Sequence, residues 1–230
     1  MEELEKIRQN YIDRDRDLEI QKFWSIKNPV ALHLLQERER AVIRGMMVAG
    51  IDFDKARLLD VGCGRAQEFA SYLRWGASGG NLFGVDLSEH RVQEAHDRGV
   101  GTVKLGSGTD LPFESDFFDI VVQNVTFSSV TSVALRRQIA SEMLRVLRPG
   151  GWVLWYDADT FVSRDPSFKE VTVDEVERIF PDVIWEWQRV TTHLGLLTRL
   201  HRWFGDGSLR MFDLLGFLKT HRLGWGRYLP

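Results

Sequence analysis

The chain has 230 residues, which suffices for one α/β domain with additions and a substantial buried core. With 43% hydrophobic and 27% charged residues, the composition excludes a globally disordered chain. The net charge of −3 argues against a nucleic-acid-binding protein, which usually carries a basic face. The single cysteine excludes an intramolecular disulfide, and neither a signal peptide nor a membrane span is recognisable, so we expect a cytoplasmic protein.

Residues 1–50 precede the first predicted core strand and are expected to form helices that cover the rest of the chain. Asn28 is followed by proline, a typical helix start, and Gly50 is suited to end that helix. Two interpretations stay open for this cover. It packs only on the edge of the sheet, or it lies over the mouth of a cofactor site with Tyr11 and Arg14 facing it.

The next hundred or so residues alternate short apolar runs with amphipathic segments, which is typical of a doubly wound parallel sheet. No internal repeat or charged linker interrupts the pattern, so a single domain is expected. The predicted strands are 58–61, 81–86, 101–105, 118–123 and 152–157.

The pattern changes after the fifth strand. Residues 183–190 alternate apolar and polar positions and predict a strand, and 194–217 is rich in Leu, Trp and Phe and predicts two short helices. The end of the chain predicts a last strand that returns antiparallel. The expected architecture is a seven-stranded, mostly parallel, Rossmann-like α/β sheet within one domain. Its parts are a helical cover (1–50), a core (51–193), a helical insertion (194–217) and a last strand (218–230).

The stretch 58–66, LLDVGCGRA, predicts a buried parallel strand that leads through a tight glycine turn into a helix. Gly62 and Gly64 lack a Cβ atom where the backbone turns, which lets a ligand come close. The helix that follows directs free N–H groups and its positive end at that ligand. This arrangement predicts a nucleotide-type binding site at the carboxyl end of the first strand.

The spacing of the glycines narrows the choice of ligand. A dinucleotide fingerprint needs a third glycine where Gln67 stands, which disfavours NAD and FAD. A P-loop is excluded because no Gly-Lys-Ser/Thr sequence follows. Residues 60–64, DVGCG, instead resemble the first motif of class I S-adenosylmethionine-dependent methyltransferases, whose cofactor carries no pyrophosphate.

Further stretches resemble the same family in the same order. Asp86 ends the second strand, where a carboxylate can accept hydrogen bonds from ribose hydroxyls, and 84–88, GVDLS, is similar to the second motif. Residues 106–113, GSGTDLPF, resemble the adenine-contacting segment, although Ser107 stands where the family usually has an acidic residue. Residues 116–122 and 144–151 resemble the segments of the fourth strand and of the approach to the fifth.

The resemblance implies a methyltransferase whose cofactor is S-adenosylmethionine. A looser similarity, through Tyr11-x-x-Arg14 and the closing Thr220-His221, connects the chain to bacterial small-molecule methyltransferases found with glycan and secondary-metabolite genes. It favours a small acceptor. The cofactor contacts implied are Asp60, Gly62, Gly64, Asp86, Leu87, Ser107, Gly108, Thr109 and Asn124, with Tyr11 and Arg14 from the helical cover.

Methyl transfer from a sulfonium is an in-line displacement, so holding the two reacting atoms in line supplies much of the catalysis. A hydroxyl acceptor also needs a general base. We predict that His221, at the start of the last strand, takes the acceptor proton while Asp157, at the end of the fifth, orients its imidazole. The alternatives are a packed or solvated histidine and an aspartate that only caps a loop. No residue cluster shows metal-ligand spacing, so no metal is expected.

The predicted function is methyl transfer to a hydroxyl oxygen of a small metabolite or sugar. Three alternatives stay open: a nucleic-acid or protein methyltransferase, a non-catalytic S-adenosylmethionine-binding partner subunit, and a propylamine transferase that uses the same pocket. Residues 194–217 are interpreted as an acceptor lid, and the alternative is an interfacial helix in contact with a membrane.

Overall fold

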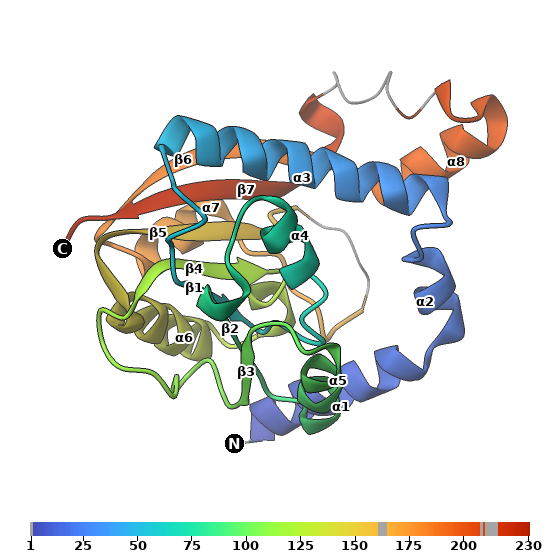
Figure 1. Ribbon diagram of the computed structural model, residues 1–230. Helices are drawn as coiled ribbons and strands as arrows, with labels where there is room; N and C mark the ends of the chain where they lie inside the picture. Colours follow the sequence, from blue (N-terminus) through green and yellow to red (C-terminus); the bar gives the residue numbers. More distant parts are fainter. Residues whose placement is uncertain (1, 161–164, 208, 210–215) are drawn as a thin grey trace.

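The computed structural model describes residues 2–160, 165–207, 209 and 216–230, and its centre is a seven-stranded sheet (Figure 1). The strand order is β3-β2-β1-β4-β5-β7-β6, and every neighbouring pair is parallel except the two that involve β7. The predicted mostly parallel sheet with an antiparallel last strand is therefore confirmed. The strands are β1 (Leu58–Val61), β2 (Leu82–Asp86), β3 (Thr102–Leu105), β4 (Phe118–Asn124), β5 (Leu147–Ala158), β6 (Val183–Thr192) and β7 (Lys219–Tyr228).

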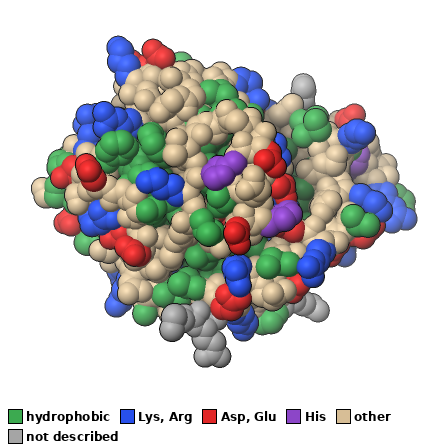
Figure 2. Space-filling model, turned by 60° about the horizontal axis from the view of Figure 1, so that its bottom comes forward, with side chains coloured by type: hydrophobic (Ala, Val, Ile, Leu, Met, Phe, Trp, Pro, Cys, Tyr) green, Lys and Arg blue, Asp and Glu red, His purple; other side chains and the backbone are tan. Residues whose placement is uncertain are grey.

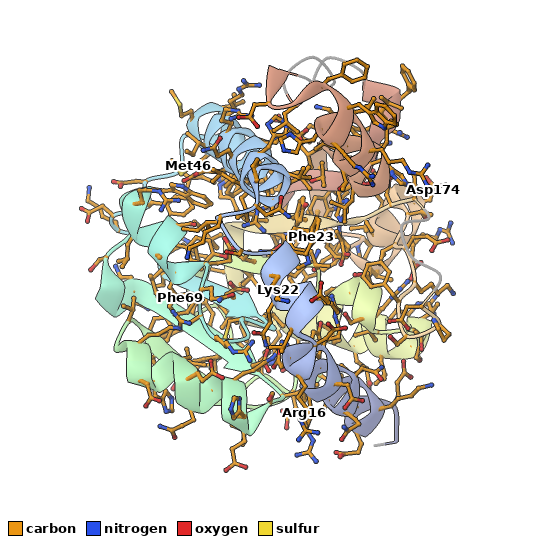
Figure 3. All side chains as sticks on the ribbon, turned by 90° about the vertical axis from the view of Figure 1, so that its right-hand side faces the viewer. Arg16, Lys22, Phe23, Met46, Phe69 and Asp174 are labelled. Atoms are coloured by element: carbon orange, nitrogen blue, oxygen red, sulfur yellow. The ribbon has the colours of Figure 1, made fainter. Side chains whose placement is uncertain are left out.

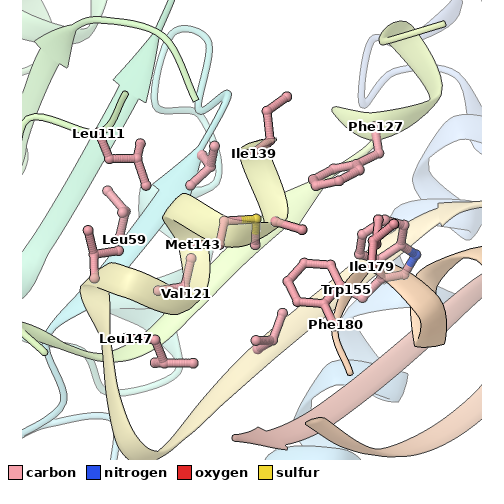
Figure 4. Packing of buried hydrophobic residues seen from close by; sticks show 14 of the residues in the cluster. Leu59, Leu111, Val121, Phe127, Ile139, Met143, Leu147, Trp155, Ile179 and Phe180 are labelled. Atoms are coloured by element: carbon pink, nitrogen blue, oxygen red, sulfur yellow. The ribbon is translucent and has the colours of Figure 1, made fainter. Parts of the chain in front are cut away.

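Helices cover both faces of this sheet, because side chains of successive strand residues point to opposite sides. In β5, Val153 and Trp155 join a core that includes side chains from α6 and α7, whereas Leu154 and Tyr156 join one with side chains from α3, α4 and α5. Figure 4 shows the first core, where Met143 of α6 lies against the sheet. These helices are α3 (Pro29–Ala49), α4 (Phe69–Arg74), α5 (Glu89–Arg98), α6 (Val133–Val146) and α7 (Val173–Ile179).

The first fifty residues form three helices, α1 (Glu2–Arg16), α2 (Leu18–Phe23) and α3. The predicted start of α3 is confirmed, since the Asn28 side chain accepts a hydrogen bond from the Val30 N–H at 3.0 Å. Its end is confirmed as well, because Gly50 adopts a left-handed φ of 65°. Figure 3 shows α1 and α2 lying in front of the strands, past Arg16, Lys22 and Phe23. The predicted helical cover is thus confirmed, and it lies across one end of the sheet.

Two predicted elements differ from the structure in extent. The fifth strand begins at Leu147, earlier than expected, because that residue already pairs with Phe118 before an irregularity in the register. In the predicted two-helix insertion, α8 (Leu194–Phe204) is present, whereas residues 208 and 210–215 lie outside the described residues. Among the described helices, none is long and apolar enough to cross a membrane.

Candidate active site

The glycine turn follows β1, at the point where the strand order reverses between β1 and β4. Gly62 and Gly64 have φ angles of 79° and 55°, a region that favours glycine. A Cβ atom on Gly62 would come within 2.5 Å of the Thr126 hydroxyl oxygen, so the turn also needs glycine for space. The backbone N–H groups of Gly62 and Cys63 donate to the Val85 carbonyl at 2.8 and 3.1 Å. The turn is therefore fixed against β2 and leaves its outer side to a ligand.

Asp86 ends β2 beside this turn and is 8% exposed. Its carboxylate accepts hydrogen bonds from the Gly64 N–H at 2.8 Å and the Ser88 N–H at 2.9 Å. Each carboxylate oxygen can accept a second bond, so the group is suited to ribose hydroxyls as predicted. Ser88 occupies the cap position of α5, but its side chain makes no capping hydrogen bond. Asp86 instead satisfies the Ser88 N–H, so this carboxylate contributes to the start of α5 as well as to the site.

Asp60 lies behind the turn and is 2% exposed. One carboxylate oxygen accepts a hydrogen bond from the Tyr72 hydroxyl at 2.9 Å, and the other has no partner among the described residues. Burial raises the pKa of Asp60 to about 7, with the hydrogen bond from Tyr72 acting against this rise. A buried carboxylate oxygen without a partner is an acceptor for an N–H or O–H group of a ligand.

The carboxyl ends of β1 and β2, the segment after β3 and helix α1 together enclose one small pocket. Gly108 provides part of its wall, since a Cβ there would come within 3.2 Å of Val61. The Ser107 hydroxyl lies 2.7 Å from that of Thr109 and accepts from the Thr109 N–H at 3.1 Å. Six of the residues predicted to contact the cofactor line this pocket: Tyr11, Gly62, Asp86, Leu87, Ser107 and Gly108.

Helix α1 fills much of this pocket. The volume that is left is about 50 Å³, whereas pockets for small molecules usually measure about 300–1,000 Å³. Ile7 of α1 is 6% exposed and packs in the same core cluster as Val61 and Ile139. The glycine turn and the Asp86 carboxylate fit the nucleoside end of S-adenosylmethionine, whereas Asp60 does not line this pocket. The cofactor can enter only if α1 moves outwards.

A charged clasp at the end of α1 holds the helix in this place. The Asp15 carboxylate pairs with Arg65 at 3.0 Å and with Arg91 at 2.7 Å. Burial opposes the charge of Asp15, but the hydrogen bonds from Arg91 and Arg65 outweigh it and lower its pKa. The Arg91 guanidinium lies 4.3 Å from the centre of the Tyr11 ring, whose hydroxyl is 2.8 Å from that of Ser129. Sequence reasoning missed the clasp, although Arg65 directly follows the glycine turn.

A second, much larger cavity lies on the other side of the end of β4. Its volume is about 880 Å³, and Val125 lines it, whereas the next residue, Thr126, lines the small pocket. We call it the acceptor cavity. Arg14 lines this cavity and not the small pocket. Its apolar wall comes mainly from α2, α3 and α8 and includes Ile20, Phe23, Trp24, Leu34, Leu35 and Leu194.

Tyr156 lies on the wall of the acceptor cavity at the end of β5. Its hydroxyl is 2.6 Å from that of Thr191, and the Arg38 guanidinium lies 5.3 Å from its ring centre. Arg38 also pairs with Glu68 at 2.5 Å and donates to the Asn124 side chain at 3.1 Å. Asn124 lines neither cavity, and its predicted contact with the cofactor competes with its bond to Arg38.

Two β-branched residues that line the acceptor cavity have left-handed backbone conformations. Val125 has a φ of 57° and Thr191 a φ of 64°. Such a conformation costs about 1–3 kcal/mol in a residue other than glycine. The Val125 N–H donates to the Tyr156 carbonyl at 2.8 Å, and the Thr191 N–H donates to the Glu37 carboxylate at 3.1 Å. The surrounding hydrogen bonds therefore hold both residues in strained conformations at the mouth of the site.

His221 also lines the acceptor cavity. Its ring stacks on Tyr156 with 5.1 Å between ring centres, and its Nδ1 atom is 2.9 Å from the Thr220 hydroxyl. Burial, together with the charge of Arg38, lowers the pKa of His221 to about 4. The imidazole is thus neutral near pH 7 and can accept a proton.

The predicted pair of His221 with Asp157 was wrong. In the ladder between β5 and β7, His221 lies opposite Ala158, and Asp157 lies opposite Arg222. Because neighbouring strand residues point to opposite faces, Asp157 and His221 lie on different sides of the sheet. The Asp157 carboxylate accepts from the N–H groups of Ser128 and Ala158 at 3.0 and 2.9 Å, and burial raises its pKa to about 6. Asp157 therefore fixes the loop after β4.

Among the described residues, no three His, Cys, Asp or Glu side chains gather closely enough to hold a metal ion. On the face of the molecule shown in Figure 2, the described Lys and Arg side chains are interspersed with Asp and Glu.

The family match covers the part of the chain that builds the small pocket, apart from its α1 wall. Residues 59–155 match the family described as a methyltransferase domain. Nocamycin O-methyltransferase from Saccharothrix syringae is 35% identical over 100 residues, which cover 41% of this chain and 35% of that protein. A demethylmenaquinone methyltransferase from Symbiobacterium thermophilum is 32% identical over 114 residues, covering 46% of this chain and 44% of that protein. The matches thus span less than half the length of these curated relatives.

A solved structure extends the likeness of the fold. The YcgJ protein of Bacillus subtilis superposes with a TM-score of 0.58 over 83% of this chain and 99% of that one, at 20% sequence identity. Residues 59–155 thus carry a methyltransferase domain of the class I type, whose cofactor is S-adenosylmethionine. The class and the cofactor predicted from the glycine turn are confirmed, whereas the roles of the individual site residues stay predictions.

Proposed function

We propose that this chain transfers a methyl group from S-adenosylmethionine to a hydroxyl oxygen of a small molecule such as a metabolite or sugar. The single observation that carries the proposal is the placement of two cavities on either side of β4, one lined by Thr126 and the other by Val125. A methyl donor in the first and an acceptor in the second would meet at the carboxyl edge of the sheet, where open α/β sheets place their ligands.

Bound S-adenosylmethionine would supply a methyl group that its positive sulfur already activates for transfer. The chain's own part is to bind and orient. Gly62 lets the cofactor approach the backbone, and Asp86 is placed for the ribose. The apolar wall of the acceptor cavity keeps water from the reacting atoms, and holding those atoms in line lowers the barrier. The O-methyltransferase named among the relatives supports an oxygen acceptor.

His221 would take the acceptor proton through its Nε2 atom, because Nδ1 is engaged with the Thr220 hydroxyl. No hydrogen-bond partner of Nε2 is found in the described part of the chain. A pKa of about 4 makes this imidazole a weak base. It is therefore better matched to a phenol or enol, which gives up its proton readily, than to an alcohol.

Calorimetry and a turnover screen test the proposal together. S-adenosylmethionine and its demethylated product should bind, with no comparable binding of NAD. Mass spectrometry after incubation with phenols, enols, other hydroxylated metabolites and nucleoside-diphosphate sugars should then show a methylated product. Binding of the cofactor without turnover of any acceptor would favour the non-catalytic partner subunit. Failure to bind the cofactor would reject the proposal.

A further inference from the structure

The acceptor cavity has a distinctive charge. Among the described residues that line it, three are arginines, Arg14, Arg38 and Arg199, and one carries a carboxylate, Asp165. The whole chain has a net charge of −3, so this cavity is a positive site in an acidic protein. A cavity with walls of low dielectric constant concentrates such a field and attracts molecules of opposite charge.

Arg38 and Asp165 are already engaged. The Arg38 guanidinium pairs with Glu68 and donates to Asn124, and the Arg38 side chain is only 14% exposed. The Asp165 carboxylate accepts from the hydroxyl and N–H of Ser167, and these bonds lower its pKa more than the charge of Arg14 does. Neither group is therefore the main attraction for a ligand in the cavity.

Arg199 is different. Its side chain makes no ion pair or hydrogen bond with any other residue in the described ranges 2–160, 165–207, 209 and 216–230. It lies on the same stripe of α8 as Leu194, Gly195 and Thr198, all of which line the cavity and recur at helical spacing. Arg14 faces the cavity from the end of α1, next to the clasp residue Asp15.

The rest of the wall suits an apolar body. Phe23 and Trp24 form an edge-to-face pair with 5.2 Å between ring centres, and Leu34 and Phe168 complete this side. The volume of about 880 Å³ lies within the range typical of pockets for small molecules. An uncharged sugar would leave the apolar wall unused, and a plain hydrocarbon would leave the guanidinium groups unused.

We infer that the methyl acceptor is an apolar, ring-sized compound that carries an anionic group, a carboxylate or a phosphate, which Arg199 and Arg14 bind. This inference rests on the proposed function for the identity of the cavity as the acceptor site. It specifies that site further: the apolar body lies against Phe23 and Trp24, and the hydroxyl points to Tyr156 and His221 at the end of β5.

The test uses three matched probes: a hydroxynaphthoate, a hydroxynaphthyl phosphate and an uncharged hydroxynaphthamide. Their binding to the full chain is followed by quenching of tryptophan fluorescence, since Trp24 lines the cavity. The demethylated cofactor is present throughout, and its own binding is measured separately by calorimetry. At least one anionic probe should bind about ten times more tightly than the amide, the size expected of a hydrogen bond to a charged group. The preferred anion distinguishes carboxylate from phosphate.

Arg199→Gln should lose most of this preference, whereas Arg202→Gln, on the same helix but not lining the cavity, should keep it. The preference should also fall as salt is added. Equal binding of all three probes, no saturable binding of any, or an unchanged preference in a folded Arg199→Gln variant would overturn the inference. Loss of cofactor binding with a retained anion preference would instead reject the proposed function.

Discussion

The small pocket and the acceptor cavity lie on either side of β4, yet they are built in different ways. Apart from its α1 residues, the small pocket is lined by residues 61–139, which strands and turns close together in sequence bring to one place. The acceptor cavity collects side chains from Arg14 to His221. Of the described residues that line it, Val125 is the one within the matched segment 59–155. The match to the methyltransferase domain therefore informs about the donor side and does not extend to the acceptor side.

The largest effect is expected from removing His221. For an alcohol acceptor, His221→Ala should lower turnover by about 10²–10⁴, the usual contribution of a general base, with a smaller loss for a phenol or enol. Cofactor affinity should not change, because His221 lines only the acceptor cavity. His193→Ala, in the same cavity wall, serves as the control. If turnover of an alcohol is near normal in the variant, positioning alone carries the reaction.

A substitution on the donor side should have the opposite signature. Asp86→Ala should weaken binding of S-adenosylmethionine by about 1–3 kcal/mol, or roughly ten- to a hundredfold, because hydrogen bonds to a charged group are lost. Binding of an acceptor analogue should stay the same. Asp97→Ala is a suitable control, since among the described residues that carboxylate bonds only to Gln93 on the surface of α5. Calorimetry that gives an unchanged dissociation constant for Asp86→Ala would remove this residue from the site.

Acid should affect the acceptor side through His221. Its pKa is about 4 in the folded chain against 6.5 for an ordinary histidine, so the unfolded chain binds more protons between these values. The stability from keeping His221 neutral is complete above pH 6.5 and is lost as the pH falls towards 4. By pH 5 the loss is about 2 kcal/mol.

Denaturant titrations of the wild type and of His221→Gln at pH 7 and pH 5 measure this loss as a difference. The comparison with the variant is needed because Asp60 and Asp157, whose pKa values are raised to about 7 and 6, change stability in the opposite direction. The wild type should lose more stability than the variant on acidification. An equal loss in both proteins would show that burial does not hold the His221 imidazole neutral.

The smallest effect is expected at the clasp. Asp15→Asn weakens the ion pairs with Arg65 and Arg91, which are partly exposed, so it should cost about 1 kcal/mol. Because α1 must move for the cofactor to enter, stopped-flow measurements should show faster association and faster release of S-adenosylmethionine. Asp13→Asn provides the control, since in the described part of the chain the Asp13 side chain bonds only to Gln9. Unchanged rates would mean that α1 does not limit entry.

Much of the donor side could be predicted because its signals are local. The sequence predicts a turn at Gly62 and Gly64 and a carboxylate at Asp86, each at the end of a strand. A parallel sheet brings such strand ends together whatever the rest of the chain does. The cover by α1 was one of two open interpretations, but a narrow apolar stripe does not reveal that Ile7 packs in the same core as Ile139 and fills the pocket.

The predicted pairing of His221 with Asp157 failed because of a difference of one residue in the strand register. Both Asp157 and His221 stand near the expected edge, but a shift of one position in a strand reverses the side on which a residue lies. Registers between β5 and β7 depend on contacts across more than sixty residues of sequence, with an insertion between them, and nothing near either residue reports them.

The left-handed conformations of Val125 and Thr191 affect the selection of thermostable variants. Glycine at Val125 would relieve about 1–3 kcal/mol of strain, so a screen for heat resistance should favour it there, whereas Thr191→Gly would also remove the hydroxyl that bonds to Tyr156. Both residues shape the wall of the acceptor cavity, and their side chains would vanish with the strain. We therefore expect heat-resistant variants from such a screen to be among the least active, and natural drift towards glycine to be removed by selection on activity.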